Sequence, residues 1–224
     1  MGTCLIVGAS RGIGRELARQ YAADGERVLA TYRKPADGVA LQAFCARHLA
    51  LDLLQENCAE TLDRQLGSEP LDLVIIAAGV AGPRSAQISA PERKDFDLVM
   101  HTNVLASMQL IPMLADRLAA RRGKLAVISS RMGSIGSTTG TASWLYRASK
   151  AALNSVLKVA SIELGARGVV CMALHPGWVR TDMGGAGADL DVEESVSSMR
   201  RVIAAATRSH NGRFLNYTGE QLEW

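Results

Sequence analysis

The stretch that decides the fold is Thr-Cys-Leu-Ile-Val-Gly-Ala-Ser-Arg-Gly-Ile-Gly, residues 3–14. Its apolar first half predicts a buried strand, and its end predicts the start of a helix. Three glycines in between leave room for a tight turn, in which the main-chain amides at the helix start can face phosphate groups. The turn therefore predicts a dinucleotide site, and a strand–helix turn without a ligand is the alternative. Its expected contacts are Gly8, Ser10, Arg11, Gly12, Ile13 and Gly14.

Apolar runs alternate with helix-like stretches along the whole chain. Strands are predicted at residues 3–7, 27–32, 46–52, 71–78, 124–130, 168–174 and 212–217, and helices at 12–23, 37–45, 55–66, 94–120, 143–166 and 191–209. Runs such as Leu73-Val74-Ile75-Ile76 lack a polar face, as is typical of parallel strands that are buried on both sides. The pattern predicts an α/β protein: a single-domain Rossmann fold over residues 1–224, with a doubly wound parallel sheet of about seven strands and helices on both faces. Ligands of such sheets bind at the carboxyl ends of the strands.

Composition excludes several other classes of function. The chain has 224 residues, of which 48% are hydrophobic, and its 25 Lys and Arg against 22 Asp and Glu are scattered, which argues against a nucleic-acid partner. Four widely spaced cysteines indicate neither a metal site nor a disulfide framework. No signal peptide and no apolar run of membrane-spanning length are evident, so we expect a cytoplasmic protein with no membrane contact.

The residues after the second predicted strand indicate which dinucleotide is bound. An NAD site carries an acidic residue there, whereas this chain reads Thr-Tyr-Arg-Lys at residues 31–34. Guanidinium groups pair well with phosphate oxygens, and Arg11 and Arg33 both lie near the expected ribose. The sequence therefore predicts NADP(H) with these two arginines at the 2′-phosphate, and solvated surface charge is the alternative.

A Tyr-x-x-x-Lys pair, Tyr146 and Lys150, would lie on one face of the predicted helix 143–166. A nearby ammonium stabilises a phenolate, so such a pair can exchange a proton with a substrate, although the spacing also occurs by chance. Ser130 ends a buried strand and is placed to hydrogen-bond a substrate oxygen. Asn103 stands among apolar residues, where it is either functional or bonded to nearby backbone.

With these residues assembled, the chain resembles a short-chain dehydrogenase/reductase of the single-domain branch. The resemblance covers nearly the full length and includes the Gly-x-x-x-Gly-x-Gly turn, Asp52-Leu53, Asn103, Ser130, Tyr146, Lys150 and Pro176-Gly177-Trp178-Val179-x-Thr181. The ending, from Gly212 to Trp224, is similar to that of sniffer-type carbonyl reductases and C-factor-like proteins.

The resemblance implies a role for each matched residue. Tyr146 is expected to be the general acid/base, with Lys150 lowering its pKa and holding the nicotinamide ribose. Ser130 would orient the carbonyl, and Asn103 would hold a water that links Lys150 to solvent. Further cofactor contacts are implied for Asp52, Leu53, Ala77, Ala78, Gly79, Pro176, Gly177, Val179 and Thr181, and substrate contacts for Arg131, Met132 and Trp178.

Two departures from the family pattern stand out. Many members have Asn-Asn-Ala-Gly where this chain reads Ile-Ala-Ala-Gly at residues 76–79, so the amide that braces the strand end is missing at Ala77. Ser130 lies 16 residues before Tyr146, a longer spacing than in many members, which indicates a small insertion over residues 136–143. The spacing leaves Ser129 and Ser134 as alternatives to Ser130, which is favoured because a strand end fixes it.

These residues predict reversible hydride transfer between NADP(H) and a carbonyl or alcohol substrate. A dinucleotide-binding signalling or regulatory protein with little turnover is the alternative. Epimerase or dehydratase chemistry is disfavoured, because only 43 residues follow Thr181 and leave little room for a substrate lobe. Residues 184–201 are expected to form a mobile lid. The family pattern implies a homodimer or homotetramer assembled through helices 94–120 and 143–166.

Overall fold

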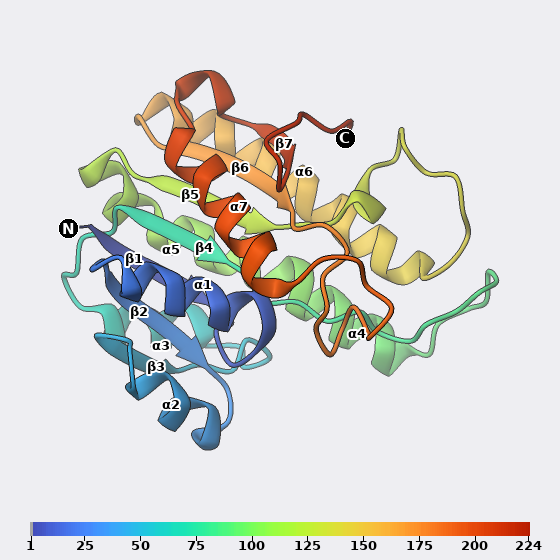
Figure 1. Ribbon diagram of the computed structural model, residues 1–224, viewed down its shortest axis with the longest axis horizontal. Helices are drawn as coiled ribbons and strands as arrows, with labels where there is room; N and C mark the ends of the chain where they lie inside the picture. The colour runs from blue at the N-terminus through green and yellow to red at the C-terminus, as the bar shows by residue number, and fades with distance from the viewer. Residues whose placement is uncertain (1) are drawn as a thin grey trace.

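The computed structural model describes residues 2–224 and contains one seven-stranded sheet (Figure 1). Its strands pair in parallel in the order β3-β2-β1-β4-β5-β6-β7, which confirms the predicted doubly wound Rossmann fold. The strands are β1 (Thr3–Val7), β2 (Arg27–Tyr32), β3 (Arg47–Ala50), β4 (Leu73–Ile76), β5 (Lys124–Ile128), β6 (Val170–His175) and β7 (Arg213–Asn216).

Helices cover both faces of this sheet. They are α1 (Gly12–Ala23), α2 (Pro35–Gln42), α3 (Cys58–Leu66), α4 (Arg93–Met100), α5 (Ala106–Arg121), α6 (Trp144–Ala166) and α7 (Val192–Ala205). Three short helical turns complete the set: η1 (His101–Leu105, a π-helix), η2 (Arg131–Gly133) and η3 (Arg208–His210). Most predicted elements are confirmed, with ends that shift by a few residues.

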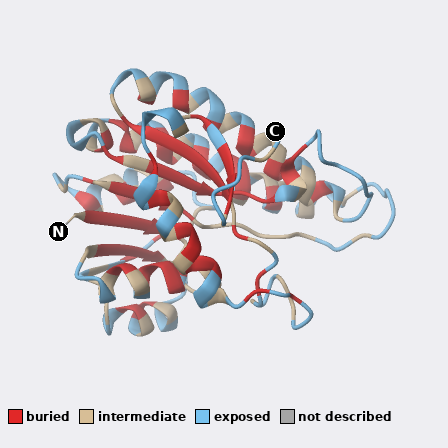
Figure 2. Cartoon of the chain, turned by 45° about the horizontal axis from the view of Figure 1, so that its top comes forward, coloured by how far each residue is buried: buried red, intermediate tan, exposed pale blue. Residues whose placement is uncertain are grey.

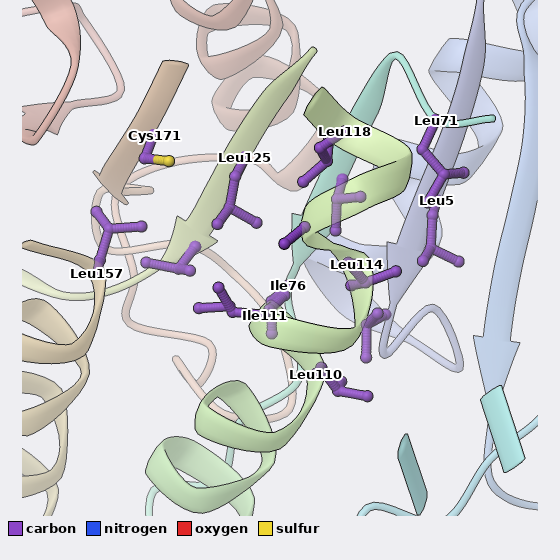
Figure 3. Close-up of a cluster of buried hydrophobic side chains, with 14 of the residues drawn as sticks. Leu5, Leu71, Ile76, Leu110, Ile111, Leu114, Leu118, Leu125, Leu157 and Cys171 are labelled. Carbon is purple, nitrogen blue, oxygen red and sulfur yellow. The ribbon is translucent and has the colours of Figure 1, made fainter. Parts of the chain in front are cut away.

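The sheet separates two hydrophobic cores because successive side chains of a strand point to opposite faces. Leu5 and Val74 pack beneath α3, α5 and α6, whereas Ile6 and Ile75 pack beneath α1, α2 and α7. Figure 2 shows the strands buried and the helices buried on their inner sides only. Figure 3 shows the leucines of α5, including Leu110 and Leu114, directed onto the strands. The central strands are therefore mostly apolar on both faces, as their sequence predicts.

The predicted helix 94–120 is interrupted. Between α4 and α5 the π-helical turn η1 accommodates one residue more than a regular helix would hold at this point. By length and mean hydropathy alone, the combined stretch Arg93–Arg121 would suffice to cross a membrane. Half of its most apolar window is buried inside the protein, which is the burial of a core helix.

Candidate active site

The candidate site lies at the edge where the parallel strands end. Because all seven strands run the same way, the turn after β1 and the segments after β4, β5 and β6 meet at one edge of the sheet. Three long loops extend from this edge in Figure 1, after β4, between β5 and α6, and after β6. The predicted site residues are distributed over these segments.

The glycine turn after β1 is closely packed. A Cβ at Gly8 would lie 2.7 Å from main-chain atoms of Ala78, and one at Gly14 would lie 2.1 Å from the carbonyl oxygen of Gly8. Gly8 and Gly12 both have positive φ, 90° and 54°, which favours glycine. The amide of Gly8 donates to Thr31 Oγ1 at 2.9 Å, which ties the turn to the end of β2.

This turn fits a dinucleotide pyrophosphate. Helix α1 begins directly after it, and within the described chain its first turn carries no acidic residue and its N-terminus no side-chain cap. Its first main-chain amides are therefore left for an anion, in a cradle that side chains larger than glycine would fill.

The two arginines predicted at the 2′-phosphate differ in their contacts. Arg33 is exposed just after β2, and its amide lies 3.4 Å from Ser10 Oγ. The guanidinium of Arg11 instead forms an ion pair with Asp182 on the loop after β6, at 2.7 Å. Both of those side chains are exposed, so the pair contributes little to stability. Arg11 is therefore shared between the turn and the loop, which the sequence did not predict.

Tyr146, Lys150 and Ser130 meet at the sheet edge. Tyr146 and Lys150 lie one turn apart on α6, with the ammonium 5.7 Å from the centre of the phenol ring. Lys150 Nζ donates to the carbonyl oxygen of Ile128 at the end of β5, at 2.8 Å. The Ser130 hydroxyl faces the Tyr146 phenol closely enough to lower its pKa. The structure thus brings three of the four predicted catalytic residues into one cluster.

Burial dominates the electrostatics of this cluster. Burial raises the pKa of Tyr146, and the Ser130 hydroxyl offsets part of that rise. Burial lowers the pKa of Lys150 to about 8. The pKa of Tyr146 is therefore raised on balance, because desolvation of the phenolate outweighs the effect of Ser130. That Lys150 favours the phenolate stays a prediction.

The position of three serines settles which of them faces Tyr146. Ser129 Oγ donates to Asn154 Oδ1 in the interior of the protein, at 2.5 Å. Ser134 Oγ accepts from the amide of Ser137 at 3.1 Å. Ser130 caps η2, where its Oγ accepts from the amide of Met132 at 3.2 Å, and it alone of the three contacts the phenol.

Asn103 lies in the π-helical turn η1 and is 1% exposed. Its Oδ1 accepts from the amide of Val80 at 2.8 Å, and its Nδ2 donates to the carbonyl oxygen of Val80 and to Ser149 Oγ, both at 2.9 Å. A Cβ at Gly79 would lie 3.3 Å from both Asn103 Oδ1 and Lys150 Nζ. The side chain therefore fixes the segment after β4 beside Lys150. The expectation that Asn103 holds a water stays a prediction.

The end of β4 is braced by main-chain bonds in place of the missing asparagine side chain. The amides of Ala77 and Ala78 both donate to the carbonyl oxygen of Val7, at 2.9 and 3.0 Å. At the end of β3, Asp52 Oδ1 accepts from the amide of Leu54 at 3.1 Å, and Leu53 packs against the core. These residues line the same sheet edge as the glycine turn.

The predicted lid over residues 184–201 is only partly a loop. From Val192 onward the chain forms α7, whose Val196 and Met199 are fully buried against the sheet. The predicted lid extended too far, because the glycines at its start do not show that the apolar stretch from Val192 forms a helix. The loop that precedes it is closed by a β-bridge between Val179 and Leu190.

Within that loop, the predicted contact residues are held by local bonds. Thr181 Oγ1 accepts from the amide of Gly184 at 3.1 Å, and the carbonyl oxygen of Pro176 accepts from Ser195 Oγ at 2.6 Å. A Cβ at Gly177 would lie 2.9 Å from Leu190 Cδ2.

The three predicted substrate contacts differ in burial. Arg131 is exposed, Met132 is half-buried, and Trp178 is 56% exposed with its Nε1 donating to the carbonyl oxygen of Gly184 at 3.0 Å.

His175 at the end of β6 was missed by the sequence analysis. Burial and the neighbouring Arg131 lower its pKa to about 4. Its place directly before Pro176-Gly177 is the signal that could have identified it.

The fold and the site define a protein of the dinucleotide-binding Rossmann class. Within this class, the chain belongs to the short-chain dehydrogenase family, whose sequence model, described as short chain dehydrogenase, matches residues 2–189. The chain is 38% identical to the protein named C-signal of Myxococcus xanthus over 158 residues, which cover 69% of this chain and 93% of that relative.

Two solved structures are similar over the whole chain. A carbonyl reductase from Pseudomonas aeruginosa in complex with NADP is 36% identical, with a TM-score of 0.87 and 100% of both chains covered. The carbonyl reductase Sniffer of D. melanogaster is 28% identical, with a TM-score of 0.88 and 100% of both chains covered. The resemblance to sniffer-type and C-factor-like relatives is thereby confirmed.

Proposed function

We propose that this chain is an NADP(H)-dependent carbonyl reductase of the cytoplasm, acting reversibly on a small carbonyl or alcohol substrate. The observation that carries the proposal is the cluster of Ser130, Tyr146 and Lys150, with the Lys150 ammonium 5.7 Å from the centre of the phenol ring, at the edge that also carries the Gly8 turn. A proton donor and a carbonyl-binding hydroxyl are thus held together next to a pyrophosphate cradle.

Each residue of the cluster has one task in the reduction. The bound reduced nicotinamide supplies the hydride that reaches the carbonyl carbon. Tyr146 gives its phenolic proton to the carbonyl oxygen, and Ser130 hydrogen-bonds that oxygen while charge develops on it. The Lys150 charge favours the phenolate that remains. Asn103 keeps the segment after β4 in place, and a water at its main-chain carbonyl would connect Lys150 to solvent.

NADP(H) is favoured over NAD(H) by the residues that follow β2. Arg33 is exposed there, Arg11 lies in the turn, and residues 31–34 include no acid that would bind a ribose 2′-hydroxyl. The similar carbonyl reductase from Pseudomonas aeruginosa is described as a complex with NADP, which supports the same choice.

The loops around the site favour an apolar substrate. Trp178 and Met183 are 56% and 39% exposed on the loop after β6, and Met132 lies two residues after Ser130. We expect Arg131, Met132 and Trp178 to contact the substrate, and residues 178–190 rather than 184–201 to act as the lid.

Helices α5 and α6 support assembly as a homo-oligomer. Met108 and Val159 are 53% and 67% exposed, although both are apolar, and they line one groove of about 350 Å³ between the two helices. Large exposed apolar side chains that adjoin one another mark an interaction surface. A second copy that packs its own α5 and α6 here would give the proposed homodimer or homotetramer.

The test is NADPH oxidation with a panel of aldehydes, ketones, quinones and 1,2-diketones, run beside NADH and beside Tyr146→Phe. We expect turnover with NADPH, and a loss of about 10²- to 10⁴-fold in kcat for the variant with its NADPH affinity unchanged. NADH preference would contradict the cofactor assignment. Full activity of Tyr146→Phe would contradict the assignment of the proton donor.

A second candidate is a dinucleotide-binding signalling protein with little turnover. The 38% identity to C-signal is the observation that favours it. NADPH binding by calorimetry without turnover of any carbonyl in the panel would support this candidate over the reductase.

A further inference from the structure

The loop between η2 and α6, residues 134–143, contains the segment 136–143, where the spacing of Ser130 and Tyr146 predicts a small insertion. It begins directly after the Ser130-capped turn η2 and ends at Trp144, the first residue of α6. The position of both hydroxyls of the proposed site therefore depends on the chain at the two ends of this loop. Ile135 within it is 77% exposed, so the side chain of Ile135 does not anchor the loop.

The far end of the loop is tied to the segment after β4. The amide of Ser143 donates to the carbonyl oxygen of Ser85 at 2.9 Å, and Trp144 Nε1 donates to that of Ser89 at 3.1 Å. Thr141 Oγ1 adds a bond to the carbonyl oxygen of Ala86 at 3.1 Å. These bonds fix the end of the loop that precedes Tyr146.

The near end of the loop is tied to the last described residue of the chain. The amides of Ile135 and Gly136 both donate to the carbonyl oxygen of Trp224, each at 3.1 Å. In Figure 1 the C-terminal end lies beside β7, next to the start of this loop. The chain turns back after β7, where the amide of Gly219 donates to the carbonyl oxygen of Asn216 at 2.9 Å, and the amide of Leu222 then donates to the carbonyl oxygen of Phe214 at 2.8 Å.

The Trp224 side chain holds this segment against the core. Its indole stacks on the ring of Phe214, with ring centres 5.6 Å apart and an angle of 24° between the planes. Phe214 is fully buried in the core under α6, and Trp224 packs against the same core. The stacking therefore sets where the Trp224 carbonyl oxygen lies, and with it the start of the loop.

We propose that Trp224 is a positioning residue of the site: by stacking on Phe214 and accepting from Ile135 and Gly136, it fixes the segment that follows Ser130. A shift of that segment moves η2, and the amide of Met132 in η2 donates to Ser130 Oγ. The Ser130 hydroxyl then loses its alignment with Tyr146. The catalytic part of this inference rests on the proposed reductase activity, whereas the anchoring part does not.

The sharpest variant acts from the loop side and leaves the tail untouched. Ile135→Pro removes one of the two donated amides, and Ser134 before it has φ −76° and ψ 119°, which a residue before proline readily adopts. Ile135→Ala is the matched control, since it removes the same exposed side chain but keeps the amide. From the other side, Trp224→Ala removes the stacking, and Trp224→Phe retains an aromatic ring for it.

Leu222→Ala is the control for general loss of packing. It lies in the same C-terminal segment and packs on the same core, but its amide bonds to Phe214 rather than to the loop. We expect it to lower the unfolding temperature without changing kcat.

Two measurements separate anchoring from catalysis. Hydrogen–deuterium exchange of peptides covering residues 131–143 should speed up in Ile135→Pro and Trp224→Ala, and should match wild type in Ile135→Ala and Trp224→Phe. In the carbonyl assay, the first two variants should lose about tenfold in kcat or more, with little change in NADPH affinity. Because Ile135→Pro leaves the tail intact, the inference stays testable even if Trp224→Ala does not fold.

Unchanged exchange in Ile135→Pro would overturn the anchoring role. Faster exchange with unchanged kcat would overturn the positioning role. If the wild-type protein turns over no carbonyl, the proposed function fails by itself, and the exchange measurement still decides whether Trp224 anchors the loop.

Discussion

The ammonium of Lys150 lies 5.7 Å from the centre of the Tyr146 ring, and its hydrogen bond goes to the carbonyl oxygen of Ile128. Lys150 is 3% exposed, and burial lowers its pKa to about 8. A lysine in such a place is destabilising when charged, so its presence indicates a task other than stability.

Replacing this lysine should therefore separate stability from activity. Lys150→Met should lose about 10²-fold or more in kcat, yet gain about 1 to 3 kcal/mol in the free energy of unfolding near pH 7, because no buried charge remains. In wild type, native Lys150 releases its proton above about pH 8 while the unfolded chain keeps it to about pH 10.4. Wild-type stability should therefore rise relative to the variant across that interval.

Denaturant titrations at both ends of that pH interval check this, with Lys124→Met as the matched control. Lys124 Nζ donates to the carbonyl oxygens of Ile203 and Ala204 at the end of α7, at 2.6 and 2.9 Å, so its loss should destabilise the protein. A less stable Lys150→Met near pH 7 would contradict the prediction.

The contact between the glycine turn and β4 predicts a second result. Gly8→Ala should lower the free energy of unfolding by about 3 kcal/mol, because a Cβ would strike the main chain of Ala78 at a positive φ. Gly25→Ala is the control: its φ is also positive, but a Cβ there meets nothing within 4 Å, so a loss of about 1 kcal/mol is expected. Thermal unfolding of both variants measures the difference, and equal losses would show that backbone strain alone is responsible.

The Arg11–Asp182 pair predicts a third result, on cofactor affinity. Arg33→Ala should raise KM for NADPH about tenfold and leave KM for NADH unchanged, because only NADPH carries the 2′-phosphate. Asp182→Asn should lower KM for NADPH about two- to threefold, since it frees Arg11 from an exposed ion pair of small energy. Steady-state kinetics with both cofactors decide this. An equal change in KM for NADH would contradict the assignment of Arg11 and Arg33 to the 2′-phosphate.

His175 predicts a fourth result, on acid stability. Because its pKa is lowered to about 4 in the native protein, the unfolded state takes up the proton first as the pH falls below about 6.5. His175 should thus lower the free energy of unfolding by up to about 3 kcal/mol near pH 4, and His175→Asn should remove that part of the pH dependence. His48→Asn, at an exposed histidine, is the control. An unchanged pH profile for His175→Asn would refute this.

Much of the fold follows from local sequence. The bounds of β1, β2 and α1 agree with the prediction, because apolar runs and glycine turns are local signals. The π-helical turn η1 was not predicted, since the bonds from Asn103 to Val80 and Ser149 join segments 23 and 46 residues away. The ion pair of Arg11 with Asp182 spans 171 residues and is equally invisible to sequence patterns.

The sequence predicted which residues form the candidate site, but it did not predict their electrostatics. Tyr146, Lys150 and Ser130 meet as the strand and helix ends imply. The rise in the pKa of Tyr146 was not predicted, because desolvation depends on how tightly α6 packs at the end of β5, which no spacing reveals. Trp224 lies 90 residues from Ser134, and its contact with the loop required the structure.

The π-helical turn His101–Leu105 also has a genetic consequence. A π-turn amounts to one residue inserted into an α-helix. Deleting one codon within it would restore an unbroken helix from α4 to α5. The deletion would also rotate α4 by about 100° relative to α5. The leucines of α5 would keep their place on the sheet, while Asn103 would turn away from Val80. One additional residue in this helix therefore allows it both to pack on the sheet and to place Asn103 against Val80 at the site.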